Sequence, residues 1–325
     1  MKQLIFVIAA AAVATSCSPR KAAVLASDPV RTKIVAGGYL FQKDTVSHAV
    51  RANHDKLVGV AGDLKSFKQF VSTLSDTSMI SIPLALDYIK TCIKATGTEN
   101  DSVFFLFNAF FFNVCNPVNA TIDQKLEPWR QQLFAQDFSA PELDQLKRNL
   151  ENCGAAIFVS EGMAYVDALP DFFFDNFHDR VSEGVREYLG LRAEELRQGF
   201  SEDAGLLISF DDLYKRVKNW EVYLNEYPEN IYTPSAQGFL EVYLETLLTG
   251  MDNSRIFELE NNSLDPQIKA LYEKVIHENA PLRSTKIISD YYQFLASRNF
   301  KGDSVGVFLK SHNLSTMLAV QPHTR

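Results

Sequence analysis

The chain has 325 residues, of which 46% are hydrophobic and 22% are charged, and its formal net charge is −8. These fractions are typical of globular proteins and exclude a largely disordered chain. The acidic balance, together with the lack of a Lys and Arg stripe, argues against a nucleic-acid partner. Phe is abundant at 24 residues, whereas Gly and Pro are few, which favours long helices with bulky cores.

The N-terminus has the pattern of a secretory signal. Lys2 precedes an apolar run over residues 4–14, and the small residues Thr15 and Ser16 follow it. A basic start, an apolar run of about 7–15 residues and a small-residue cleavage site define such signals. The run is too short for a transmembrane helix, which needs about 20 apolar residues.

Ala14-Thr15-Ser16-Cys17 resembles the lipobox of bacterial lipoproteins, although Leu is usual where Ala14 stands. The resemblance implies cleavage after residue 16, acylation of the Cys17 thiol and anchoring in a membrane by the attached lipid. Stable anchoring takes more than one acyl chain, a condition that this family meets. The alternative is an ordinary secretory signal that ends near a cysteine.

The segment after Cys17 is basic and begins Ser18-Pro19-Arg20-Lys21. An acidic run at this place marks some lipoproteins for the cell exterior. The basic run therefore favours the periplasmic face of the outer membrane, with surface exposure left open. Residues 17–55 are predicted to be the lipidated cysteine and a tether, in which Asp28–Tyr39 is either a short helix or more tether.

From about residue 60 the apolar residues recur at helical spacing. The stripes are Ile82-Leu86-Ile89-Ile93, Ile122-Leu126-Trp129-Leu133, Leu143-Leu146-Leu150 and Phe210-Leu213-Val217-Trp220-Leu224-Tyr227. Leu240–Leu248 is apolar on more than one side, so we expect that helix to be packed from several directions.

Turn signals predict where these helices end. They are Thr96-Gly97-Thr98, Asn116-Pro117, Ala140-Pro141, Cys153-Gly154, Tyr227-Pro228 and Thr249-Gly250. Ser139 and Thr233 are predicted to cap the helices that follow them. Ala155–Ser160 and Gly205–Ser209 have the composition of short strands, which would pair with each other in one small hairpin.

Six phenylalanines crowd the stretch Val103–Cys115. The stretch is too short to span a membrane, and Asn108 and Asn113 interrupt it. We therefore expect a central core helix, and the alternative is an aromatic-lined cavity for an apolar ligand.

The cysteines beyond Cys17 are Cys92, Cys115 and Cys153. Cys92 lies on an apolar stripe and is predicted to be a buried thiol. Cys115 and Cys153 both lie in chain-turning contexts, and the sequence leaves open whether they form a disulfide. No two cysteines have the spacing of a zinc site.

The C-terminal third contains an internal repeat with an offset of 52 residues. This offset aligns Trp220 with Tyr272 and Phe239 with Tyr291, and each copy contains a proline between two helical stretches. Repeated helix pairs are typical of α-solenoids, whose units need a stacked neighbour to bury their apolar faces.

The stretch from Trp220 to Asn230, followed by Ala236, resembles the tetratricopeptide-type helix pairs of bacterial envelope lipoproteins. Those pairs often carry Tyr-Pro-Asp-Ser between their helices, whereas this chain has Asn230 at the Ser position and a period longer than about 34 residues. The resemblance covers about a third of the chain. It implies a concave surface that binds another protein.

No catalytic motif is present: the sequence lacks His-Glu-x-x-His, Gly-x-Ser-x-Gly and a glycine-rich phosphate loop. The histidines are scattered over His48, His54, His178, His277, His312 and His323. The acidic candidates for a glycosidase pair are Glu161, Asp167, Asp171 and Asp175. Glu161-Gly162 is predicted to begin a helix, where the carboxylate would be a solvated cap.

The sequence thus predicts an all-α fold of antiparallel helix pairs, with a solenoid-like, tetratricopeptide-like C-terminal half and room for one small hairpin. The predicted segments are a signal (1–16), a lipidated tether (17–55), an N-terminal helical domain (56–200) and a helix-pair repeat domain (201–325). Cys17 is the only functional site residue assigned. No catalytic residue, cofactor or metal is expected.

The expected function is a non-enzymatic envelope lipoprotein, a scaffold or adaptor that binds a protein or peptide and not nucleic acid. One alternative is an envelope hydrolase acting on glycan or peptidoglycan. The other is a carrier of an apolar ligand. The sequence leaves enzymatic activity uncertain but favours its absence.

Overall fold

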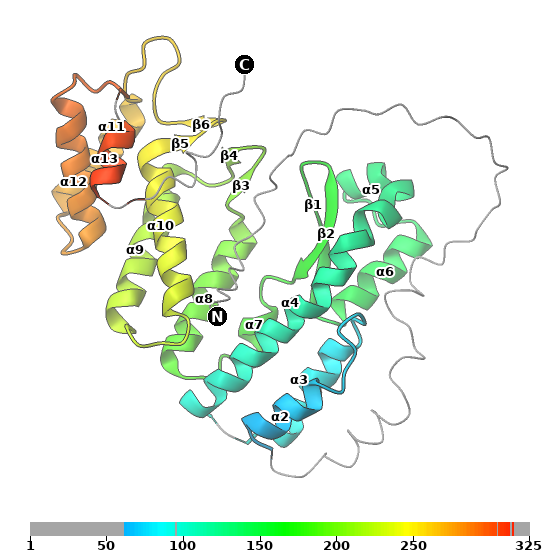
Figure 1. The fold of residues 1–325 in the computed structure, drawn as a ribbon. Coiled ribbons are helices and arrows are strands. Elements are labelled where there is room, and N and C mark those ends of the chain that lie inside the picture. Colours follow the sequence, from blue (N-terminus) through cyan, green and yellow to red (C-terminus); the bar gives the residue numbers. More distant parts are fainter. Residues whose placement is uncertain (1–61, 95, 304, 313, 315–325) are drawn as a thin grey trace. The chain divides into compact units, whose positions relative to one another are not determined.

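The computed structural model describes residues 62–94, 96–303, 305–312 and 314. Over these residues the protein is mostly helical, and its strands form three two-stranded antiparallel hairpins (Figure 1). The predicted all-α class with a small β-hairpin is confirmed. The predicted signal, the tether, Cys17 and three of the histidines (His48, His54 and His323) lie outside the described residues.

The N-terminal part consists of α2 (Leu64–Val71), α3 (Ser81–Cys92) and the long helix α4 (Thr98–Leu126). Asp63 begins α2 through a capping box, because its carboxylate accepts the Ser66 N–H at 2.8 Å while the Ser66 hydroxyl accepts the Asp63 N–H at 2.7 Å. A 3₁₀ turn (Glu127–Trp129) and the short α5 (Arg130–Phe134) follow α4.

Helix α4 carries the phenylalanine run, and its core role is confirmed. Phe104, Phe107 and Phe111 are fully buried. Their rings lie 4.8–6.3 Å from those of Phe173 and Phe177 on α7 (Phe172–Phe177). The aromatic side chains therefore fill the space between α4 and α7 with one another.

The helical stretch Thr98–Phe134 is also long and apolar enough to cross a membrane, judged by length and composition alone. Its most apolar window has a mean hydropathy of 1.3, and 44% of that window is buried inside the fold. A buried core helix meets the same criteria, and the contacts of its phenylalanines place α4 in the core of this protein.

The predicted helix end at Asn116-Pro117 was wrong, because α4 continues through Pro117 to Leu126. Proline removes one backbone hydrogen bond, which leaves the carbonyl of Asn113 without its usual donor. Both Asn113 and Pro117 are exposed, so water can satisfy that carbonyl. Buried Val114 and Val118 hold the helix against the core on its other side.

After α6 (Pro141–Glu151) the chain forms β1 (Ala155–Ser160) and β2 (Met163–Ala168). The strand Ala155–Ser160 is confirmed, but its predicted partner was wrong. β1 pairs with β2, whereas Gly205–Leu206 is the strand β4, which pairs with β3 (Ser201–Glu202).

Glu161 and Gly162 form the β1/β2 turn. The prediction that they begin a helix is therefore wrong. Both have positive φ, 49° and 82°, which is the backbone of a type I′ hairpin. The predicted caps are also corrected. Ala140 rather than Ser139 precedes α6, and Tyr232 rather than Thr233 precedes α10, with no side-chain cap at either place.

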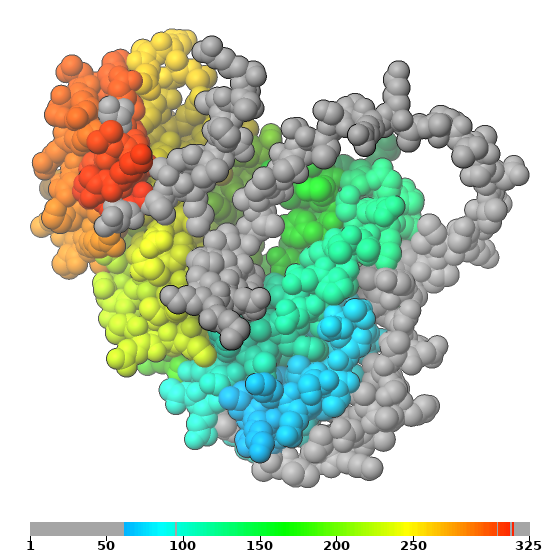
Figure 2. Space-filling model, in the orientation of Figure 1, coloured from blue at the N-terminus to red at the C-terminus, as the bar shows by residue number. Residues whose placement is uncertain are grey.

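The C-terminal part alternates long helices with short hairpins (Figure 1). The elements in chain order are α8 (Glu183–Gln198), β3 and β4, α9 (Phe210–Glu226), α10 (Thr233–Thr249), β5 (Gly250–Met251), β6 (Ser254–Arg255), α11 (Pro266–Glu278), α12 (Arg283–Ala296) and α13 (Val305–Ser311). In the space-filling view, α11 to α13 (orange and red) lie beside α10 (yellow) (Figure 2). The helix predicted over Leu240–Leu248 is buried almost throughout, as expected.

The buried apolar side chains fall into two clusters. One cluster extends from Phe67 to Leu189 and includes Tyr232, and the other extends from Leu213 to Leu314. Tyr188 on α8 packs against both clusters, and its ring stacks on Tyr232 at 4.2 Å. Helix α8 therefore connects the two clusters.

Candidate functional site

The C-terminal helix pairs repeat in their contacts as well as in their sequence. Trp220 on α9 and Tyr272 on α11 are both fully buried. Trp220 stacks on Phe239 of α10 with ring centroids 5.2 Å apart, and Tyr272 packs edge-on against Tyr291 of α12 at 6.0 Å. The four residues are the two aligned pairs of the 52-residue offset, so equivalent residues make equivalent contacts.

The same two side chains are also bonded to the helix that precedes each pair. Trp220 Nε1 donates to Glu195 Oε1 on α8 at 2.6 Å, and the Tyr272 hydroxyl donates to the carbonyl of Leu247 on α10 at 2.7 Å. In both cases the acceptor lies 25 residues earlier in the chain. Each pair is thus bonded to its predecessor, which is the arrangement of a helical repeat.

Glu195 is a buried carboxylate that joins three helices. Its Oε2 accepts the Tyr243 hydroxyl at 3.0 Å and Arg192 Nη1 at 2.5 Å, in addition to the Trp220 bond on Oε1. Burial and the nearby Glu195 charge raise the pKa of Tyr243, so its hydroxyl keeps its proton. Both carboxylate oxygens are occupied, which makes Glu195 a structural residue. Sequence reasoning missed it, because an acidic residue in a charged helix gives no distinguishing signal.

The three hairpins are hydrogen-bonded to one another in chain order. The Glu202 carboxylate on β3 accepts the Ser160 hydroxyl at 2.8 Å and the Glu161 N–H at 2.9 Å. The Asn253 N–H, in the β5/β6 turn, donates to the carbonyl of Ala204 at 2.9 Å. The three hairpins therefore form a connected row (Figure 1).

The first hairpin has one face toward the core and one toward solvent. Ala164 and Val166 are buried, whereas Tyr165 and Met163 on the other face are 37% and 47% exposed. The Tyr165 ring stacks on Phe158 of β1 at 5.7 Å. This outer face is the most aromatic exposed part of the hairpin row.

The four acidic candidates do not form a catalytic pair. Glu161 and Asp175 are exposed, and Asp171 forms an ion pair with Arg197 of α8. Burial raises the pKa of Asp167, although the N–H of Ala168 and the charge of Arg192 oppose the rise. Within the described residues no hydrogen bond joins any two of the four carboxyl groups.

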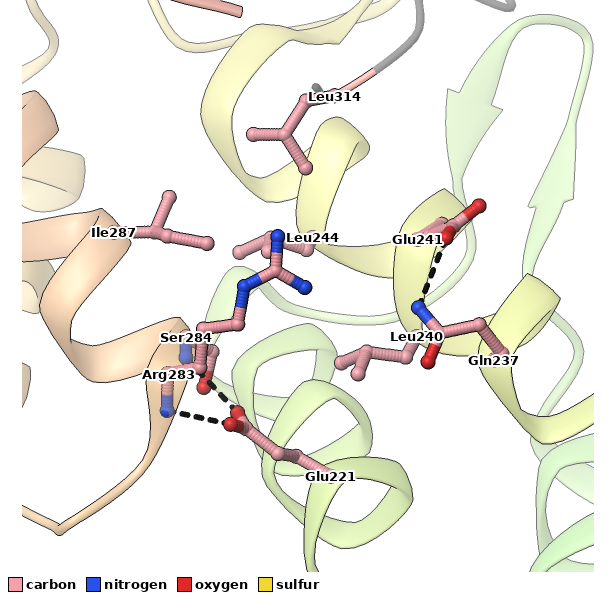
Figure 3. Close-up of a pocket in the computed structure, with 9 residues that line it drawn as sticks. All are labelled: Glu221, Gln237, Leu240, Glu241, Leu244, Arg283, Ser284, Ile287 and Leu314. Atoms are coloured by element: carbon pink, nitrogen blue, oxygen red, sulfur yellow. Dashed lines mark hydrogen bonds between the residues drawn. The ribbon is translucent and has the colours of Figure 1, made fainter. Parts of the chain in front are cut away.

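A small pocket lies where α12 meets α9 and α10 (Figure 3). Its residues are Glu221, Gln237, Leu240, Glu241, Leu244, Arg283, Ser284, Ile287 and Leu314. Its volume of about 30 Å³ suits one water molecule, whereas small-molecule sites usually exceed about 300 Å³.

The Glu221 carboxylate forms the polar side of this pocket. Its carboxylate accepts the N–H groups of Arg283 at 2.5 Å and Ser284 at 3.0 Å (Figure 3). These are the first donors of α12, which has Leu282 at its N-cap and therefore no cap of its own. Glu221 thus caps α12 from a neighbouring helix.

The three described cysteines are free and buried, so no disulfide joins Cys115 and Cys153. Burial raises the pKa of both thiols to about 12, which keeps them protonated and unreactive. Among the described residues no group of three His, Cys, Asp or Glu side chains could hold a metal ion.

No family model matches this sequence, and no curated protein or solved structure is significantly similar to it.

Proposed function

We propose that this protein is a lipid-anchored scaffold of the bacterial envelope that binds a protein or peptide partner. The observation that carries the proposal is the repeated helix pair, with equivalent aromatic contacts at Trp220 and Tyr272. Stacked helix pairs offer extended surfaces that suit macromolecular partners better than small molecules. The lipobox-like residues 14–17 supply the anchor, and the basic stretch after Cys17 favours the periplasmic face of the outer membrane.

The site chemistry favours a binder over a hydrolase. A glycosidase needs two carboxyl groups on opposite sides of one bond, about 5–9.5 Å apart. Glu161 lies in an exposed turn, Asp171 is ion-paired, and the oxygens of buried Glu195 are occupied by three donors. The carrier hypothesis is also disfavoured, because Phe104, Phe107 and Phe111 pack against aromatic rings of α7.

The test is capture of cross-linked complexes from membranes. Cells that express the tagged full chain are treated with a cross-linker, and the captured proteins are identified by mass. An unrelated tagged lipoprotein serves as the control bait. We expect one envelope protein to be enriched with this chain alone and to bind the purified protein in detergent. Enrichment no greater than with the control bait would refute the scaffold proposal.

A further inference from the structure

The outer edge of β2 is already occupied by side chains of α4. In an antiparallel pair, every second residue points its N–H and C=O away from the neighbouring strand. For β2 these residues include Ala164 and Val166. The Asn119 side chain bonds both backbone groups of Val166, at 2.7 and 2.9 Å, and Asp123 Oδ1 accepts the Ala164 N–H at 2.8 Å. Helix α4 thus completes this edge of the hairpin.

The outer edge of β1 has no such partner. Val159 and Ile157 lie opposite Ala164 and Val166, so their N–H and C=O groups point away from β2 by the same alternation. No described residue bonds these four groups. β1 lies on the side of β2 that is away from α4 (Figure 1). The hairpin therefore has one completed edge and one open edge.

The open edge is long, and β3 meets its end at Ser160, whose hydroxyl donates to Glu202. Native proteins usually shorten an edge strand or place Lys or Pro on it, since an open edge pairs readily with another chain. β1 has six residues, Ala155–Ser160, with no charge and no proline, whereas each strand of the other two hairpins has two residues. β1 is thus suited to accept an added strand.

The chain segment that contains β1 is strongly acidic. Residues 152–207 contain eleven Asp and Glu residues against four Arg and no Lys. Three of these arginines are already paired, Arg186 with Glu183, Arg192 with Glu195 and Arg197 with Asp171. Glu202 adds a carboxylate at the tip of the hairpin. A cationic partner would complement this charge.

The outer face beside β1 also suits long cationic side chains. On an added strand, every second side chain would lie on the face that carries the Phe158 and Tyr165 stack. Lys and Arg pack their methylene groups on aromatic rings and are attracted to the ring faces. Alternating cationic residues would therefore match this face.

We propose that the free edge of β1 binds an extended cationic segment of a partner protein, which adds to the hairpin as a third strand. The proposal rests on the scaffold function and names the partner chemistry at one site. The occupant is a separate protein, and a second copy of this chain is an outcome that the test distinguishes.

The probe is a synthetic twelve-residue peptide that alternates Lys and Val, titrated into the full chain in detergent. The test variant is Val159→Pro, because the Val159 N–H is not used in pairing with β2 and its loss spares the hairpin. Val159→Ala is the matched control, since it shortens the side chain and keeps the N–H. We expect Val159→Pro to weaken binding by about tenfold or more and Val159→Ala by about threefold or less.

Two further readouts define the binding mode. A peptide with Glu in place of Lys should not bind, and the Lys peptide should slow hydrogen exchange at the amides of Ile157 and Val159. Equal melting temperatures of the two Val159 variants show that the fold is intact. Ile157→Pro replaces Val159→Pro if the latter does not fold.

Three results would overturn the proposal. One is unchanged affinity of Val159→Pro for the Lys peptide, and another is unchanged exchange at both amides. The third is a dimer of the free chain that Val159→Pro dissociates, which would assign the edge to a second copy. Capture experiments with the unmutated chain and with Val159→Pro distinguish failure of the edge proposal from failure of the scaffold proposal. If Val159→Pro still captures it, the edge proposal is wrong and the scaffold function stands, whereas no capture by the unmutated chain refutes the scaffold.

Discussion

At the scale of single residues, buried charge determines how the helices are joined. Glu195 is 7% exposed and accepts hydrogen bonds from two other helices, through Trp220 and Tyr243. A buried carboxylate is costly to desolvate, and it is retained where several donors surround it. Removing the carboxylate leaves those donors unpaired.

We predict that Glu195→Ala lowers the free energy of unfolding by about 3–5 kcal/mol, because it leaves Arg192 without its buried partner. The neighbouring Glu194 is exposed and forms a surface ion pair with Arg197, so Glu194→Ala should cost about 1 kcal/mol or less. Urea unfolding of both variants measures the difference. Equal midpoints for the two variants would contradict the structural role of Glu195.

Asp167 gives a prediction for the pH dependence of stability. Burial raises its folded-state pKa above the ordinary value, so the folded state binds the proton more tightly than the unfolded state. The stability from this group is therefore full below the unfolded pKa and is lost as the pH rises through the folded pKa.

Asp167→Asn removes the charge and keeps an oxygen to accept the Ala168 N–H, which Asp167 Oδ1 binds at 2.7 Å. We expect the variant to melt higher than the parent near pH 7 and at nearly the same temperature near pH 3. Thermal melts at several pH values measure this difference. A variant that melts lower than its parent at neutral pH would show that the charged form is the one the fold favours.

At the scale of elements, α4 is the helix on which the N-terminal part is assembled. Its buried face meets α2, α3, β2 and α7, and Phe111 is fully enclosed. Phe111→Ala should cost about 3–5 kcal/mol through lost contacts and the cavity left behind. Phe105 on the same helix is 47% exposed, so Phe105→Ala is the control and should cost far less. Similar melting temperatures for the two variants would show that Phe111 does not lie on the buried face of α4.

The helix repeat gives a prediction about cooperativity. Trp220→Ala removes the contact with Phe239 and the bond to Glu195, and should cost about 3–5 kcal/mol. Since each pair depends on its neighbour, we expect new protease cuts across residues 210–300. Cuts confined to α9 would show that the pairs are independent.

Individual elements show what local sequence could and could not indicate. The stripe from Phe210 to Tyr227 predicted α9 almost to the residue, because helix periodicity is local. Pro117 was misread as a helix end because its tolerance depends on exposure, which is a tertiary property. The turn at Glu161-Gly162 was missed because Glu-Gly is a weaker hairpin signal than Asn-Gly or Asp-Gly.

At the scale of the whole molecule, the prediction concerns the anchor. If Cys17 is the acylated residue, Cys17→Ser should block lipid attachment and release the protein from membranes, because the signal alone provides no lasting anchor. Labelling with a radioactive fatty acid and fractionation of cells measure both effects. The same membrane fraction for parent and variant would refute the lipoprotein proposal.

The predicted domain boundary between residues 200 and 201 stays a prediction.

The sequence by itself determined the helical class, the core role of the phenylalanine run and the 52-residue repeat. Each of these depends on spacing along the chain, which periodicity records directly. The tertiary structure alone decided the partner of β1, the three donors around Glu195, the cap that Glu221 provides for α12 and the open edge at Ile157 and Val159. These features join residues that are distant in the chain or depend on what is missing beside a strand, so no local pattern encodes them.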